Sequence, residues 1–306
     1  MLPSRISKTS DPLGRYYTDP TVGKALVDAM GIECPDIVMD ICAGEGALVR
    51  EAANVWGDSS FITVDIEESG RSALLRNLSG KPVTHHVADA LDYDLAERVG
   101  LQWGEADAAL CNPPYIRPKW EKHFLEIIED AGLSHIFPRM REIPADLLFI
   151  AQNLRLLRQG GRLGLILSDG IVAGERFAEF RKTLLQKHRV ERVIELPRRI
   201  FRNTDAKAHI VVISKHGNGS ETVAIQRLDK SGALSPQFNI SINLAVKRLD
   251  YSYFAQRRGV LTCDQQRIGV AHPVGVEGVW LSDRSYSIRS GHWRAVTDAL
   301  FDARPD

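Results

Sequence analysis

The stretch LCNPPYIR, residues 110–117, places an asparagine, two prolines and an aromatic ring directly after an apolar run. Proline has a fixed φ and no N–H group, so Pro113 and Pro114 can continue neither a helix nor a strand ladder. Asn112 precedes a proline, and this position is biased toward extended conformations. The sequence therefore predicts a rigid loop that presents the Asn112 amide and the Tyr115 ring.

The stretch DICAGEGAL, residues 40–48, follows another apolar run, and its glycines, Gly44 and Gly46, allow a sharp turn and the close approach of a ligand. A dinucleotide fingerprint would need a third glycine where Val49 stands, which argues against a nicotinamide cofactor. Asp40 precedes the turn, and its charge would repel a pyrophosphate but attract a cationic ligand. S-adenosylmethionine, with a sulfonium and an ammonium group, is such a ligand.

Two further acids stand at the ends of the next two apolar runs. Asp65 follows Asp40 by 25 residues, close to the spacing of roughly 20 at which an acid bonds ribose hydroxyls in nucleotide-binding units. Asp89 ends the third run, where its carboxylate can accept a hydrogen bond from an adenine amino group. One such acid is often only a helix cap. Three acids at successive strand ends beside a glycine turn predict a nucleotide-like ligand at the carboxyl edge of a sheet.

Short runs rich in valine and isoleucine alternate with helical patterns, which predicts a parallel sheet with right-handed crossovers. The stretch HGNGS joins the last two runs and predicts an antiparallel hairpin at the sheet edge. The predicted fold class is α/β: a doubly wound, mostly parallel seven-stranded sheet with an antiparallel edge hairpin and a small C-terminal extension. We predict strands at 36–41, 61–66, 83–88, 106–111, 162–168, 190–197, 208–215 and 221–228, and helices at 46–56, 67–78, 144–159 and 174–188.

The composition is that of a globular protein, with 44% apolar residues in a chain of 306. No window approaches 18 apolar residues and residues 1–20 lack an apolar signal core, so we expect a cytoplasmic protein without a membrane span. The four cysteines form no CxxC pair, which predicts reduced thiols and no metal site. The pattern weakens after residue 228, so we expect a first domain over 1–228 and a less regular region over 229–306.

Charge is divided unequally along the chain. Residues 1–180 hold 18 lysines and arginines against 27 aspartates and glutamates, a net charge of −9, and residues 181–306 hold 21 against 12, a net charge of +9. A basic half is a sign of a nucleic-acid partner. The basic residues gather in one segment: Arg181, Lys182, Lys187, Arg189, Arg192, Arg198, Arg199, Arg202 and Lys207.

These stretches together resemble the N6-adenine-specific DNA methyltransferases of restriction-modification systems, in the gamma arrangement that places the cofactor motif before the catalytic one. The resemblance covers roughly residues 14–215 and rests on GRYYTDP, DICAGEGAL, CNPPY, and ELPRRIF followed by AHIVVISK. RLDYSYF, at 248–254, is similar to the opening of a target-recognition region. The resemblance implies a Rossmann-like methyltransferase fold, S-adenosyl-L-methionine as cofactor, and methyl transfer to the N6 amine of a flipped-out adenine in double-stranded DNA.

The resemblance gives each matching residue an expected role. The Asn112 side-chain oxygen and the Pro113 carbonyl hold the two amine hydrogens, so that the nitrogen lone pair points at the methyl group. Tyr115 stacks on the flipped base and Phe201 closes its other face. The catalytic tetrapeptide is Asn112, Pro113, Pro114 and Tyr115; the cofactor residues are Tyr16, Thr18, Asp40, Gly44, Gly46, Asp65, Ile66 and Asp89; the contacts to the DNA backbone are Arg198, Arg199 and Arg202.

The chain departs from the family pattern in two respects. Ala90 stands where a large aromatic residue often stacks on the cofactor, so we expect Ile66 or Leu91 to fill that place. Only about 90 residues follow the catalytic part. Target recognition is therefore compact, or comes from a specificity or restriction subunit, or the chain is incomplete.

Three other functions stay open on the sequence. The same fold and loop would suit a protein-glutamine methyltransferase, whose acceptor is also an amide nitrogen, or an RNA adenine methyltransferase. The chain could also be a non-catalytic, modification-like subunit of a larger assembly. The intact Asn-Pro-Pro-Tyr sequence argues against this last function.

Overall fold

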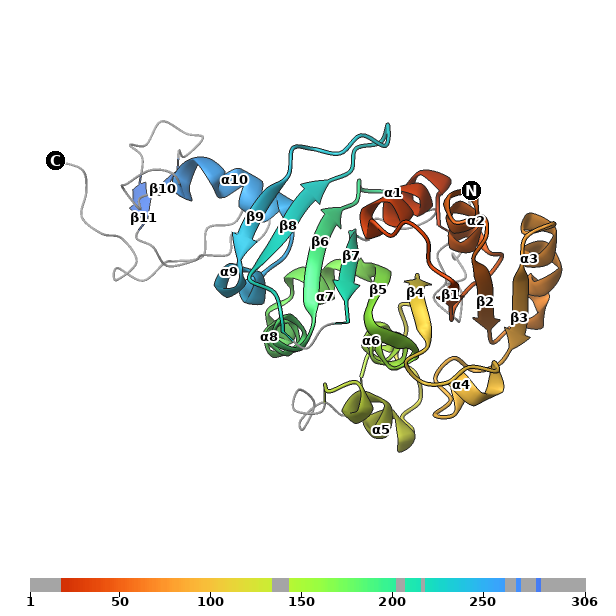
Figure 1. Ribbon diagram of the computed structural model, residues 1–306. Helices are drawn as coiled ribbons and strands as arrows, with labels where there is room; N and C mark the ends of the chain where they lie inside the picture. Colours follow the sequence, from red (N-terminus) through yellow and green to blue (C-terminus); the bar gives the residue numbers. More distant parts are fainter. Residues whose placement is uncertain are drawn as a thin grey trace, which may run out of the picture. The chain divides into compact units, whose positions relative to one another are not determined.

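The computed structural model describes residues 18–133, 143–201, 207–215, 218–261, 268–270 and 279–281. Within this part the chain divides into two compact units, Met1–Tyr251 and Ser252–Asp306. In the first unit the residues form a mixed sheet of nine strands with helices packed on it (Figure 1). Its strands are β1 (Ile37–Asp40), β2 (Ser60–Asp65), β3 (Val83–Val87), β4 (Ala106–Cys111), β5 (Leu157–Ser168), β6 (Arg189–Glu195), β7 (Ala208–Ser214), β8 (Thr222–Arg227) and β9 (Phe238–Ser241).

The strand order in the sheet is β3-β2-β1-β4-β5-β7-β6-β8-β9. Strands β1 to β5 all pair in parallel with one another, and the order reverses between β1 and β4. Such a reversal is the point at which ligands bind in open α/β sheets. The predicted α/β class and all eight predicted strands are confirmed, whereas β9 was not predicted, and the sheet has nine strands rather than seven.

The predicted hairpin between residues 208–215 and 221–228 is wrong. β7 lies between β5 and β6, antiparallel to both, while β8 pairs in parallel with β6 and antiparallel with β9. Every residue of β7 is buried, as expected of a strand that has neighbours on both sides and both faces covered. The antiparallel pair at the edge is instead β8 with β9.

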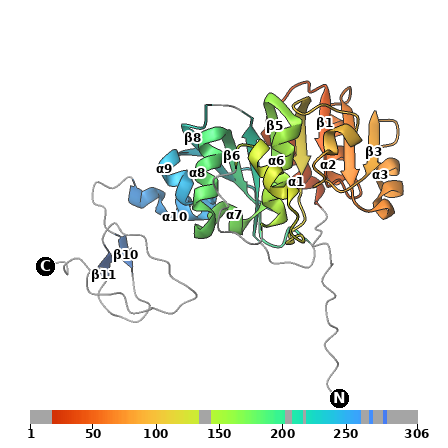
Figure 2. The ribbon, with the colours of Figure 1, turned by 90° about the horizontal axis from the view of Figure 1, so that it is seen from below.

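Helices pack on the sheet (Figures 1 and 2). α1 packs against α2, α5 against α6, and α8 against α9. All twelve residues of α6 are buried, which places this helix inside the molecule. The helices are α1 (Pro20–Met30), α2 (Ala47–Val55), α3 (Arg71–Asn77), α4 (Leu95–Arg98), α5 (His123–Asp130), α6 (Ala145–Leu156), α7 (Asp169–Ala173), α8 (Ala178–Lys187), α9 (Ile242–Lys247) and α10 (Tyr251–Leu261), with 3₁₀ turns η1 (Glu68–Gly70) and η3 (Glu175–Phe177).

α1 lies very close to the sheet. A Cβ added at Gly164 of β5 would stand 2.7 Å from a Leu26 methyl carbon and 2.8 Å from the Met30 sulfur, both on α1. The glycine therefore allows the helix to touch the strand backbone. The start of α1 is fixed separately, where Asp19 caps the helix by accepting a hydrogen bond from the Thr21 N–H at 2.9 Å.

The boundary between the units lies after residue 251 rather than after residue 228, where the sequence suggested it. β9 pairs with β8, and α9 packs on α8, β8 and β9, so residues 238–247 belong to the first unit. The described strands of the second unit, β10 (Ile268–Val270) and β11 (Val279–Leu281), form an antiparallel pair. None of the described helices is long and apolar enough to cross a membrane.

Candidate active site

The three acids and the asparagine expected at strand ends lie at one edge of the sheet. Asp40 and Asp65 are the last residues of β1 and β2, Asp89 lies two residues after β3, and Asn112 follows β4 directly. Asp40 is in register with Thr63 of β2 and with Leu110 of β4. Because these strands are parallel, their carboxyl ends bring the four side chains to the same rim. We call Asp40, Asp65 and Asp89 the acid edge.

The glycine turn is attached to the acid edge through Asp65. The Asp65 Oδ2 atom accepts a hydrogen bond from the Gly44 N–H at 2.8 Å, and its Oδ1 atom accepts one from the Glu67 N–H at 3.0 Å. Gly44 and Gly46 have φ of 52° and 81°, a conformation that other residues rarely adopt. A Cβ added at Gly44 would meet no atom within 4 Å, so the space beside this turn is open to a ligand.

Asp40 lies beneath the turn and is 1% exposed. Burial, with a smaller contribution from the nearby charge of Asp65, raises the pKa of its carboxyl to about 7, against a hydrogen bond from the Cys42 N–H at 3.1 Å. Its burial excludes direct contact with a ligand in this conformation. Asp40 can therefore act on a ligand only through its charge, at pH values where it is ionised.

Asp89 is exposed, and its Oδ1 atom accepts a hydrogen bond from the Leu91 N–H at 2.9 Å. Two residues were expected to replace the missing aromatic platform for the cofactor. Ile66 is 57% exposed at the end of β2, whereas Leu91 is 6% exposed and belongs to the core. Ile66 is thus the one that presents an apolar surface at the edge.

The loop after β4 is held at several points. The Asn112 Nδ2 group donates a hydrogen bond to Thr18 Oγ1 at 3.1 Å, which turns the amide oxygen away from Thr18. The Tyr115 hydroxyl donates to the Ile166 carbonyl of β5 at 3.2 Å. Pro113 is buried and Pro114 is half-buried. The loop is held by these contacts, and Thr18 contacts Asn112 directly.

Two thiols connect the glycine turn with the catalytic loop. The Sγ atoms of Cys42 and Cys111 lie 3.2 Å apart, and both cysteines are free. Burial raises the pKa of both thiols, that of Cys42 well above its ordinary value. They therefore stay protonated and serve as packing between the two loops.

Some residues that the sequence assigned to the site lie elsewhere. Phe201 is 2% exposed and packs in the core with Leu196 and Ile210, so its ring offers no open face for stacking on a base in this conformation. Arg198 and Arg199 are exposed on the turn after β6. Tyr16 and Arg202 lie outside the described residues.

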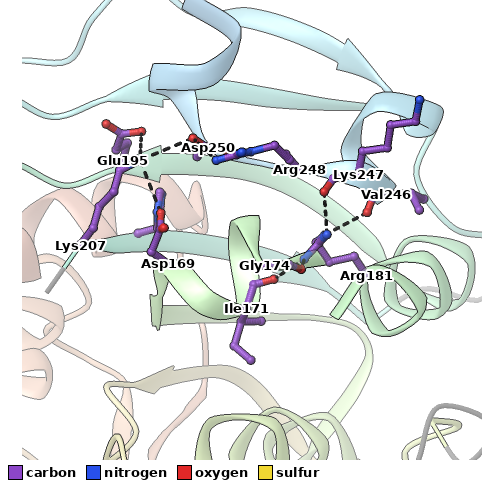
Figure 3. A network of polar contacts seen from close by, with 11 residues as sticks. Asp169, Ile171, Gly174, Arg181, Glu195, Lys207, Val246, Lys247, Arg248 and Asp250 are labelled. Atoms are coloured by element: carbon purple, nitrogen blue, oxygen red, sulfur yellow. Dashed lines mark hydrogen bonds and ion pairs between the residues drawn. The ribbon is translucent and has the colours of Figure 1, made fainter. Parts of the chain in front are cut away.

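Two members of the basic segment, Arg181 and Lys207, are engaged by other parts of the protein (Figure 3). Arg181 is buried and Lys207 is half-buried, which corrects their grouping with exposed arginines and lysines. Arg181 of α8 is 1% exposed, and burial lowers its pKa to about 10. Its guanidinium donates to backbone carbonyls rather than to phosphates. The four acceptors are Ile171 and Gly174, each at 2.8 Å, Val246 at 3.0 Å and Lys247 at 2.6 Å.

Lys207 is the centre of an ion-pair network with Asp169, Glu195, Asp250 and Arg248 (Figure 3). Its Nζ atom lies 3.0 Å from Glu195, 3.4 Å from Asp169 and 3.5 Å from Asp250. Arg248 pairs with Asp250 at 2.7 Å. The network joins the ends of β5 and β6 to the residue before α10, which is a structural role.

One polar residue near the catalytic loop was missed by the sequence reasoning. Asp146, in the first turn of α6, is 4% exposed and accepts a hydrogen bond from Ser168 Oγ at 3.2 Å. Burial raises the pKa of its carboxyl to about 6. The signal that could have found it is the single acid within the otherwise apolar stretch PADLLFI.

The described residues contain no group of three or more histidine, cysteine, aspartate or glutamate side chains arranged to hold a metal ion. The chemistry available at the rim is therefore that of carboxylates, an oriented amide, proline carbonyls and an aromatic ring. Such groups bind a polar, positively charged, nucleoside-like molecule and can orient an amine beside it.

Comparison with known proteins assigns the chain to a family. The family model of the N-6 DNA methylases matches residues 2–238. A type I restriction enzyme methylase subunit of Methanocaldococcus jannaschii is 24% identical over 213 residues, 66% of this chain and 37% of the relative. A second, from Mycoplasma pneumoniae, is 22% identical over 73% of this chain and 46% of its own length.

Solved structures agree with the fold. A type I restriction-modification system methyltransferase subunit from Streptococcus thermophilus superimposes with a TM-score of 0.59 at 21% identity, over 82% of this chain and 54% of that one. The chain thus spans about half or less of the length of these relatives. The match of the family model over most of the chain identifies it as a member of the N-6 DNA methylase family.

Proposed function

We propose that this chain transfers a methyl group from S-adenosylmethionine to the N6 amine of a flipped-out adenine in double-stranded DNA. The observation that carries the proposal is the Asn112-Pro113-Pro114-Tyr115 loop, held at the end of β4 beside the acid edge. Membership of the N-6 DNA methylase family supports adenine in DNA over RNA adenine or protein glutamine as the acceptor.

The residues of the acid edge fit S-adenosylmethionine. Among the described residues, the carboxylates of the acid edge accept hydrogen bonds from the backbone N–H groups of Cys42, Gly44, Glu67 and Leu91. No described lysine or arginine bonds to them. Arg98 acts on Asp89 through its charge alone, and carboxylates without a directly bonded lysine or arginine favour a cationic ligand. Asp65 would hold the ribose hydroxyls, Asp89 the adenine amine, and Ile66 would cover the adenine ring.

The catalytic loop would orient the acceptor. The exocyclic amine of adenine is a weak nucleophile, because its lone pair is delocalised into the ring. The Asn112 oxygen and the Pro113 carbonyl would accept its two hydrogens and favour tetrahedral geometry at nitrogen. S-adenosylmethionine, when bound, supplies a methyl group on a positively charged sulfur. As the bond from nitrogen to the methyl carbon forms, the methyl–sulfur bond would break and leave its electron pair on sulfur, and the amine would lose one proton to water. Catalysis would therefore rest on placement and electrostatics.

DNA binding would use further parts of the chain. Arg198 and Arg199 are exposed and are proposed to contact phosphates, together with Arg202. Tyr115 is proposed to stack on the flipped base, which contributes about 1–3 kcal/mol per base. The curated relatives are named as subunits of type I restriction enzymes. We therefore propose that a specificity or restriction subunit is a further partner of this chain.

The decisive experiment offers the full chain three acceptors with methyl-labelled S-adenosylmethionine: unmethylated DNA, RNA, and protein that contains accessible glutamines. Digestion and mass spectrometry identify the labelled product, and sequencing of the modified DNA maps the site. We expect N6-methyladenine from DNA with the wild type and none with Asn112→Ala. Label in RNA or in glutamine would replace the proposed substrate. Cofactor binding without transfer to any acceptor would favour a non-catalytic subunit.

A further inference from the structure

A pocket of about 200 Å³ lies on the β4–β5 side of the catalytic loop. Its walls come from the loop after β4, the first turn of α6, the end of β5, and the α7–η3 segment. This is the same edge of the sheet as the acid edge, on the other side of the switch point between β1 and β4. The lining residues are Tyr115, Ile116, Arg117, Pro144, Asp146, Ser168, Ile171, Arg176 and Phe177.

The walls of the pocket suit a flat aromatic ligand. The half-buried Tyr115 contributes a ring, and Ile116, Ile171 and Pro144 contribute aliphatic surface, whereas Phe177 is 1% exposed and offers no open face for stacking. Aromatic and apolar faces of this kind stack on nucleobases.

Two exposed arginines also line the pocket. Arg117 lies on the loop after β4, and the Arg176 guanidinium lies 4.4 Å from the centre of the Phe177 ring. Exposed guanidinium groups beside a base-sized pocket are suited to the phosphates that flank an extruded nucleotide.

Asp146 is the buried polar group of the pocket. It forms no ion pair among the described residues; its oxygens accept from Ser168 Oγ and from the Leu147 N–H, both at 3.2 Å. An acid in the first turn of a helix is favoured by the helix dipole, but this needs no burial. The charge of Arg176 acts on Asp146 but forms no ion pair with it, and a buried carboxyl without a directly paired cation costs stability. Such costs concentrate at functional sites.

The remaining hydrogen-bonding capacity of adenine decides what Asp146 could offer. The proposed function places both N6 hydrogens on Asn112 and Pro113. The polar atoms left on the base, N1, N3 and N7, are acceptors only. A neutral carboxyl has one O–H donor, whereas a carboxylate has none. A base that fills the pocket would remove water from Asp146 and present an acceptor, and both effects favour the neutral form.

We propose that this pocket receives the extruded adenine, that the carboxyl O–H of Asp146 donates a hydrogen bond to one ring nitrogen, and that Arg176 contacts the adjoining phosphate. The inference rests on the proposed function and names two acceptor-binding residues beyond the tetrapeptide. Ser168 would hold the Asp146 carboxyl in place. The burial that already raises the pKa of Asp146 to about 6 makes its protonation on base binding less costly.

The test uses a duplex that carries the site mapped for the wild type, with the target adenine replaced in turn by its 1-deaza, 3-deaza and 7-deaza analogues. We expect one analogue to lose about 2- to 13-fold in kcat/KM with the wild type, the value of one hydrogen bond. Asp146→Asn retains an N–H donor and should show the same loss. Asp146→Leu should methylate adenine and that analogue equally. Arg176→Gln should raise KM for all the duplexes alike.

The outcomes separate this inference from the proposed function. A wild type that does not methylate the unmodified duplex contradicts the function itself. A wild type that methylates adenine and all three analogues equally overturns the role of Asp146, even if Asp146→Leu fails to fold. The role of Asp146 is also overturned if Asp146→Leu still methylates the sensitive analogue less efficiently than adenine. In that case Asp146 only caps α6, and its loss would lower the melting temperature without removing the discrimination between adenine and the analogue.

Discussion

Two regions of this molecule gather acids, and they differ in what faces those acids. In the ion-pair network, Glu195 and Asp250 are almost fully buried, and Lys207 lies within 3.5 Å of both. At the acid edge, Asp40 and Asp65 receive only backbone N–H groups among the described residues. An acid matched by a protein cation has a structural explanation. An acid that lacks one has no such explanation, and at the acid edge we propose that a cationic ligand supplies the charge.

The largest expected effect is a loss in the free energy of unfolding of the protein when the ion-pair network is broken. Lys207→Met retains most of the side-chain volume but leaves Glu195, Asp250 and Asp169 facing one another without their shared cation. Removal of one partner from a buried ion pair costs about 3–5 kcal/mol. We expect a loss of this size in the free energy of unfolding, measured by urea denaturation, with unchanged affinity for S-adenosylmethionine. A variant as stable as the wild type would show that the network is not structural.

Replacement of Asp40 should stabilise the protein, whereas replacement of Lys207 should destabilise it. Its pKa of about 7 lies above that of an unfolded aspartate, so the native state holds a proton that the unfolded state has lost between pH 4 and 7. The free energy of unfolding therefore falls as pH rises through this window, by about 4 kcal/mol in total. Asp40→Asn should remove this slope and be more stable than the wild type at pH 8. If the free energy of unfolding depended on pH in the same way in both proteins, the raised pKa of Asp40 would be contradicted.

The catalytic loop should affect rate rather than binding. Asn112→Ala removes an acceptor that acts on the amine in the transition state, and the loss of one such group costs at least about 100-fold in rate. S-adenosylmethionine affinity should stay close to that of the wild type. Single-turnover kinetics on the mapped duplex give the rate, and calorimetry gives the affinity. A rate near that of the wild type would remove Asn112 from the mechanism.

The smallest expected effect concerns the two exposed arginines on the turn after β6. Arg198→Ala and Arg199→Ala should each reduce the slope of log affinity for DNA against log salt by about 0.9, if each arginine contacts one phosphate. Arg181 provides the contrast, because its guanidinium is engaged by four carbonyls. Filter binding at several salt concentrations measures the slope. An unchanged slope in the double variant would place the DNA surface elsewhere on the chain.

The strand-end residues could be predicted from the sequence because parallel strands share one carboxyl edge. The positions of four strands were enough to predict that their end residues share an edge, namely Asp40, Asp65, Asp89 and Asn112. The burial of Phe201 could not be predicted in this way. Its burial depends on the packing of the turn after β6 against the core, which no local pattern encodes.

Charge patterns carry no information about burial, and this explains the other errors. Arg181 and Lys207 look like surface bases in the sequence, yet one holds the end of α9 and the other holds three acids. The position of β7 between β5 and β6 likewise depends on long-range pairing, whereas the turn-like stretch HGNGS suggested a local hairpin. Local signals therefore located the catalytic loop but not the partners of buried charges.

The central claim is that the acid edge binds S-adenosylmethionine, and calorimetric titration of this cofactor into the wild type and Asp65→Ala tests it most directly. Asp65 is the half-buried acid whose Oδ2 atom accepts from the Gly44 N–H of the glycine turn and whose Oδ1 atom accepts from the Glu67 N–H. A hydrogen bond to a charged group contributes about 1.5–3 kcal/mol. The account predicts binding by the wild type and a loss of about 10- to 100-fold in affinity in Asp65→Ala. Equal affinities in the two proteins would contradict it.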